Sequence, residues 1–136
     1  MLVLVRFTER ELTAALEGAA KAVLAAQDKS VRKRRRTADD AWEELSRYLR
    51  FQLLDGLGDQ VLPVLVSLPD VEVAPGTKPT FTDAQVTAAV EERLGDDVRG
   101  IKRRVHVQAR VALVKIALEN LPPRADPDAL IVPDHL

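Results

Sequence analysis

Apolar residues recur at spacings of three and four residues along most of this 136-residue chain, and no other feature constrains its fold as strongly. In the first segment the pattern passes through Leu12, Leu16 and Val23. Thr8 stands before it and can cap the N-terminus of a helix. We therefore predict a helix over residues 8–35, with many alanines on a face that another helix can approach closely.

A second helix is predicted to begin at residue 38, because Thr37 is followed three residues later by an aspartate, as in a capping box. Gly56 and Gly58 are expected to end it. Residues 60–68 are predicted as a short separate helix, with an edge strand as the alternative, because proline is tolerated in either place.

Two more helices are predicted in the second half of the chain. Thr82 and Gln85 form a capping signal, and Gly95 follows the apolar run behind them. The longest helix is predicted over 98–121, although residues 103–113 also alternate as a strand would. This helix should carry two apolar stripes and lie centrally in the core, one stripe being Ile101, Val105, Ala109, Ala112 and Ile116 and the other Val107, Val111, Val114, Leu118 and Leu121.

The expected fold is mainly α, a single compact domain of four to five helices. Residues 2–7 are short and rich in β-branched side chains, so a short N-terminal extended segment is predicted there. Two prolines follow the last helix, so we place the helical domain at 1–121 and a C-terminal arm at 122–136.

Composition excludes several classes of function. The chain has no cysteine, so disulfides and thiol chemistry are excluded, and it has no apolar run of about 18 residues that could cross a membrane. The apolar N-terminus lacks the basic start and cleavage site of a signal peptide. A soluble, cytoplasmic protein without a membrane partner is expected.

Charge is nearly balanced, with 20 basic and 21 acidic residues, but it is segregated along the chain. Residues 29–36 and 99–115 are basic stretches without an acid, and acids follow the first at 39–44 and precede the second at 91–97. Such a surface has a polarity that a partner, or a second copy of the chain, can recognise.

The basic stretches are candidate contacts for phosphates, because clustered cations release counterions from nucleic acid. The candidate nucleic-acid or polyanion contacts are Lys29, Arg32, Lys33, Arg36, Arg99, Lys102, Arg103 and Arg110. Two other interpretations of the first stretch stay open: a solvated helix end neutralised by nearby acids, and a docking site for an acidic protein patch.

No catalytic, metal or cofactor site is predicted. Two histidines and three serines form no triad by spacing, and His106 on a charged helix face is expected to be solvated. The aspartates of the C-terminal arm lack the glycine turn and terminal glutamate of a calcium loop. We therefore expect a protein that is not an enzyme and needs no cofactor.

Aromatic and terminal apolar residues supply candidates for a protein interface. Trp42 and Phe51 are expected in the core, whereas Tyr48 could lie in the core or at an interface. The apolar N-terminus and the apolar patch in the C-terminal arm could each dock on a neighbour. The candidate protein-interface residues are Leu2, Leu4, Tyr48, Leu130 and Ile131.

Two segments, 42–82 (WEELSRYLRFQLLDGLGDQVLPVLVSLPDVEVAPGTKPTFT) and 121–136 (LPPRADPDALIVPDHL), resemble small uncharacterised proteins encoded by viruses of actinobacteria. The resemblance covers about half of the chain and includes no motif with known chemistry. It implies a bacteriophage origin, with the host cytoplasm or the virion as location, and no defined activity.

The predicted function is that of a small, non-enzymatic binding protein. It would act through protein–protein association, as an oligomer, a virion part or a binder of a host protein. It would use the alanine-rich first helix, the terminal arms and the complementary charged patches. The alternative is a nucleic-acid-binding protein that uses the two basic stripes.

Overall fold

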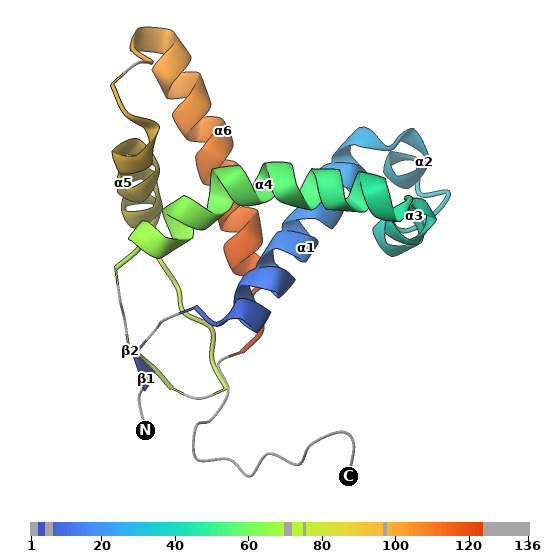
Figure 1. Ribbon diagram of the computed structural model, residues 1–136, viewed down its shortest axis with the longest axis horizontal. Helices are drawn as coiled ribbons and strands as arrows, with labels where there is room; N and C mark the ends of the chain where they lie inside the picture. The colour runs from blue at the N-terminus through green and yellow to red at the C-terminus, as the bar shows by residue number, and fades with distance from the viewer. Residues whose placement is uncertain (1–2, 5–6, 70–71, 75, 97, 124–136) are drawn as a thin grey trace.

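The computed structural model describes residues 3–4, 7–69, 72–74, 76–96 and 98–123, and this part of the chain is mainly helical, as predicted (Figure 1). Two short strands pair antiparallel, with Val3 opposite Val73 and Leu4 opposite Glu72. The described elements are β1 (Val3–Leu4), α1 (Glu9–Gln27), α2 (Lys29–Arg32), α3 (Ala38–Glu44), α4 (Arg47–Ser67), β2 (Glu72–Val73), α5 (Asp83–Leu94) and α6 (Gly100–Glu119).

Three helices begin at the threonines that the sequence marks as caps. In α1 the Thr8 backbone N–H donates to Glu11 Oε1 at 2.8 Å, and the Glu11 N–H donates back to Thr8 Oγ1 at 3.1 Å. The same reciprocal bonds join Thr82 to Gln85 in α5. Thr37 caps α3 in the same way. Each box satisfies backbone donors that have no partner inside the helix.

The predicted helix ends in the middle of the chain are wrong in two places. α1 stops at Gln27, because extended Asp28 uses its side chain to cap α2. The second predicted helix breaks at Leu45, and Ser46 caps a new helix by accepting from the Leu49 N–H at 3.1 Å. The prediction for 8–35 missed the first break because the apolar period continues across it.

α4 runs without interruption through Gly56, Gly58 and Pro63, so the predicted end at the glycines is also wrong. Its inner face is buried over about two turns, and this burial outweighs the cost of glycine in a helix, about 1 kcal/mol each. The buried side chains of that face are Leu57, Val61, Val64 and Leu65. The segment 60–68 is therefore the end of this helix and not a separate one.

The core lies where α4 and α6 pack on α1. Ala15 and Ala19 of α1 are fully buried there, so the alanine face that was expected to let a helix approach serves the core. These two alanines are not available to a second copy, whereas Ala26 farther along the same helix is exposed. Trp42 is buried against Ala20 and Leu57, as expected, whereas Phe51 is 65% exposed and the expectation that it lies in the core is wrong.

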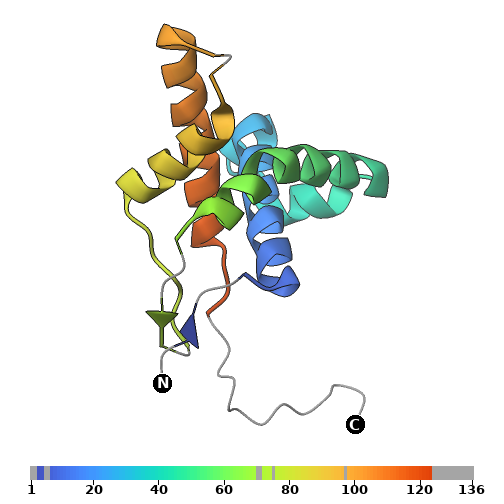
Figure 2. The same ribbon diagram turned by 60° about the vertical axis from the view of Figure 1, so that its left-hand side comes forward.

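α6 confirms the predicted helix and excludes the strand alternative for 103–113. Only one of its two apolar stripes is buried, the one that includes Val107 and Val114. The other begins with Ile101 at 81% and Val105 at 58% exposure, so the prediction that both stripes enter the core is wrong. The first half of α6 extends beyond α1 and α4, and of the described helices only α5 lies beside it (Figures 1 and 2).

Two helical glycines differ in their surroundings, and we expect opposite effects when each is replaced. A Cβ at Gly18 in α1 would collide with the Asn120 side chain at the end of α6, whereas a Cβ at Gly56 in α4 would meet nothing within 4 Å. Gly18→Ala should lower the free energy of unfolding by about 1–2 kcal/mol, because overpacking outweighs the helix preference for alanine. Gly56→Ala should raise it by about 0.5–1 kcal/mol.

Urea denaturation of the two variants beside the parent measures both effects. A stabilising Gly18→Ala would contradict the close approach of α1 and α6. A destabilising Gly56→Ala would contradict the open surroundings on α4.

Candidate interaction surfaces

The first basic stretch forms α2 and the turn after it, and its charges are partly neutralised inside the chain. Arg36 Nη2 lies 2.5 Å from Asp28 Oδ2, and Arg36 Nη1 contacts Glu44. Lys29, Arg32 and Lys33 are exposed. Arg36, a predicted polyanion contact, is thus engaged by two carboxylates.

Asp28 is the centre of this network. Its carboxylate accepts bonds from the Ser30 hydroxyl at 2.5 Å and from the backbone N–H groups of Ser30 and Val31 at 2.9 and 3.2 Å. The Ser30 hydroxyl and the Arg36 guanidinium hold the pKa of the Asp28 carboxyl well below its ordinary value. A lowered folded-state pKa means that the ionised carboxylate stabilises the fold.

Asp28→Asn should therefore destabilise the protein in a pH-dependent way. Asparagine caps a helix as well as aspartate, so the substitution removes mainly the charge. The folded pKa lies below the unfolded value of about 3.9, so the contribution is complete at pH 7 and is lost as pH falls below about 4. Chemical denaturation at several pH values should show the variant and parent converging at acid pH. The control is Glu43→Gln, because Glu43 forms no ion pair among the described residues. If Asp28→Asn lowered the free energy of unfolding by the same amount at pH 3 as at pH 7, the role of the charge would be contradicted.

Arg103 in the second basic stretch holds the connection between α5 and α6. Its guanidinium donates to the backbone carbonyls of Gly95, of Val98 at 3.2 Å and of Glu91 at 3.3 Å. Carbonyls at the C-terminal end of a helix lack intrahelical donors, so a guanidinium satisfies them well. A residue predicted to contact nucleic acid therefore has a structural role.

Other cations of α6 reach solvent. Arg99 is exposed and its Nε donates to the Asp96 carbonyl at 3.2 Å, whereas Lys102 and Arg104 are exposed with no bond among the described residues. Arg110 is half-buried. Arg104 was not among the predicted contacts, because it lies off the helical stripe that joins Lys102 and Arg103 to Arg110. Arg103 was included because helical spacing does not show that an arginine bonds within the chain.

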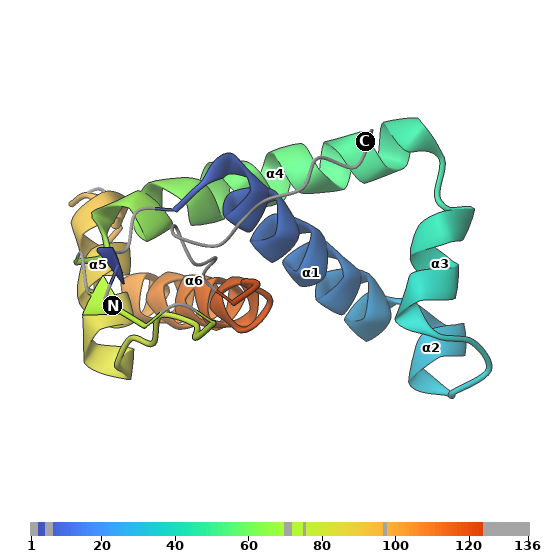
Figure 3. The ribbon, with the colours of Figure 1, turned by 90° about the horizontal axis from the view of Figure 1, so that it is seen from below.

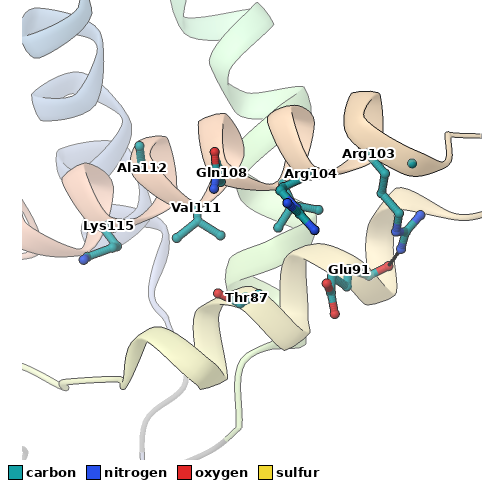
Figure 4. Close-up of a pocket in the computed structure, with 10 residues that line it drawn as sticks. Thr87, Glu91, Arg103, Arg104, Gln108, Val111, Ala112 and Lys115 are labelled. Carbon is teal, nitrogen blue, oxygen red and sulfur yellow. Dashed lines mark hydrogen bonds between the residues drawn. The ribbon is translucent and has the colours of Figure 1, made fainter.

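A groove of about 640 Å³ lies between α5 and α6. Val107 and Val111 form part of its lining, and Thr87 and Glu91 face it from α5 (Figure 4). Arg104 faces it from α6. Arg103 and Lys115 also line the groove, so it combines apolar side chains with three cations and one acid, Glu91.

The predicted interface residues fall on different parts of the chain. Tyr48 is 67% exposed on α4, where its hydroxyl accepts from Gln52 Nε2 at 2.9 Å. Leu4 belongs to β1, and nothing further is described for its side chain. The other predicted interface residues, Leu2, Leu130 and Ile131, lie outside the described residues. Phe51 and the α6 stripe that begins with Ile101 are exposed apolar surfaces that the sequence did not indicate. Periodicity along one helix cannot say which of its stripes another helix will cover.

The two basic stretches do not form one face. α2 and α3 lie at one end of the molecule, and α5 with the start of α6 lies at the other (Figures 1 and 3). α1 and α4 span the region between them. The two basic stretches are therefore separated along the molecule.

Within the described ranges, no three histidine, cysteine, aspartate or glutamate residues are grouped so as to hold a metal ion. His106 is exposed on α6, as predicted. No helix of the described chain has the length and apolar character needed to cross a membrane. Comparison with models of known protein families, with curated proteins and with solved structures finds no match to this chain.

Proposed function

We propose that this is a small, non-enzymatic binding protein that acts through protein–protein association, with a second copy of itself as partner. The observation that carries the proposal is the exposed apolar stripe on α6. Ile101 and Val105 occupy one side of a helix whose opposite side is buried, and Ala109 and Ala112 continue that stripe as exposed small residues. Large apolar side chains grouped in this way mark interaction sites.

The shape of this stripe supports contact with another helix. Ile101, Val105, Ala109 and Ala112 follow one another at spacings of three and four residues, so they line one side of α6. The small side chains allow close approach, and the larger ones supply apolar area at about 25 cal/mol per Å². We also propose a bacteriophage origin, because residues 42–82 and 121–136 resemble viral proteins. That origin is compatible with a protein that associates with copies of itself, and it defines no activity.

Ile101→Ser combined with Val105→Ser should abolish self-association. The parent should show a mass that rises above 15.0 kDa with concentration in the micromolar range, and the double variant should stay at 15.0 kDa. Sedimentation equilibrium measures both, and circular dichroism confirms that the variant is folded. Ala84→Ser, at an exposed alanine near the start of α5 and outside this stripe, is the control and should leave association unchanged. A parent that is monomeric at every concentration would overturn the proposal.

Nucleic-acid binding is the second candidate, supported by the exposed N-cap residue Arg99 and by exposed Lys102 and Arg104 in the first half of α6. Duplex DNA binding should weaken with salt, with a log–log slope of about −0.9 for each phosphate contact. Changing the three residues to alanine should make that slope less steep by the equivalent of up to about three phosphate contacts. Arg32→Ala with Lys33→Ala, at the other end of the molecule, is the control. Fluorescence anisotropy that detects no binding at about 50 mM salt would exclude this candidate.

A further inference from the structure

The outer side of α4 combines aromatic rings with acids. We define the α4 outer face as Tyr48, Phe51, Asp55 and Asp59, all exposed. Their spacing places them along one side of the helix, opposite the buried residues. Asp55 and Asp59 have no ion pair among the described residues, and no lysine or arginine occurs from 51 to 77. Two arginines lie beside these residues in the sequence. The Arg50 Nε donates to the Leu45 carbonyl at 3.2 Å, and Arg47, one residue before Tyr48, is exposed.

The outer side of α6 has the opposite charge. We define the α6 outer face as Ile101, Lys102, Arg104 and Val105, again all exposed. The two apolar side chains lie between the two cations around the helix, and no acid occurs from residue 98 to residue 118. An apolar centre flanked by charge is the arrangement expected of a docking surface.

These two faces match each other in chemistry and cannot meet within one molecule. Rings and acids on α4 complement aliphatic side chains and cations on α6. Tyr48, Phe51 and Asp55 lie in the first half of α4, which adjoins α3 at one end of the molecule, whereas the first half of α6 projects at the other (Figures 1 and 3). We propose that the α4 outer face of one copy docks on the α6 outer face of a second copy, in a head-to-tail contact.

Charge argues against a symmetric contact. Two α6 outer faces packed together would bring lysine and arginine against their own kind, and two α4 outer faces would bring aspartates together. Like charges placed across an interface weaken it, whereas the mixed contact pairs opposite charges. This inference rests on the proposed self-association and specifies which surfaces meet.

A head-to-tail contact uses two different surfaces, so every copy in an assembly keeps one face of each kind for its neighbours. Such contacts close into a ring if the rotation between copies allows it and otherwise grow as open chains. We expect the mean mass to pass beyond a dimer as concentration rises, with no stop at two copies.

Complementation between two variants tests the contact. One variant carries Tyr48→Ser and Phe51→Ser, and the other carries Ile101→Ser and Val105→Ser. Each keeps one intact face, so each alone should be monomeric, and an equimolar mixture should form a 1:1 complex that grows no further. Its mass would be twice 15.0 kDa. Sedimentation velocity of the two proteins, separately and mixed, gives the result, and circular dichroism confirms that both are folded.

The other outcomes separate this inference from the proposed function. A parent that never associates overturns both. A parent that associates while one variant alone still forms dimers overturns the head-to-tail contact and leaves self-association standing, through whichever face that variant retains. A mixture that stays monomeric although the parent associates also overturns the head-to-tail contact.

Charge supplies a second readout that does not depend on removing apolar side chains. Association of the parent should weaken as salt rises, because screening removes an attraction between opposite charges. Asp55→Lys with Asp59→Lys should weaken association, and Lys102→Glu with Arg104→Glu in the same chain should restore it. Association that strengthens with salt, or a fourfold variant that is no better than the twofold one, would contradict the pairing of these faces.

Discussion

α4 and α6 pack on the same helix, α1, and the small side chains of that helix make this arrangement possible. Ala15 and Ala19 are fully buried where the helices meet, and Gly18 lies against Asn120 at the end of α6. Larger residues there would push the helices apart, because interaxial distance depends on the side chains at the contact. Burial of the valines and leucines on α4 and α6 therefore depends on the lack of bulk on α1.

The segregated charge of the chain has two separate uses. Some cations hold the fold: Arg36 joins Asp28 to Glu44, and Arg103 ties the end of α5 to the start of α6. Others, such as Lys102, keep their charge toward solvent. Adjacent residues in one basic stretch thus differ in role, and only the exposed ones can take part in binding.

The exposed apolar surface follows from the way α6 is placed. Its second half packs on α1, but its first half projects past the core, where α5 is the one described helix beside it (Figure 2). One side of that half remains uncovered as a result, with Ile101 and Val105 on it. Among the described residues, no helix covers the side of α6 that carries these two apolar side chains.

The sequence by itself determined the helical class and three helix starts, because capping boxes such as that of Thr8 are local hydrogen bonds between residues three apart. It also located the long last helix and the solvated His106. Only the tertiary structure decided that α4 continues through Gly56, that Phe51 is exposed and which stripe of α6 is buried. Those outcomes depend on which surfaces other helices cover, and periodicity along one helix carries no information about the neighbour that covers it.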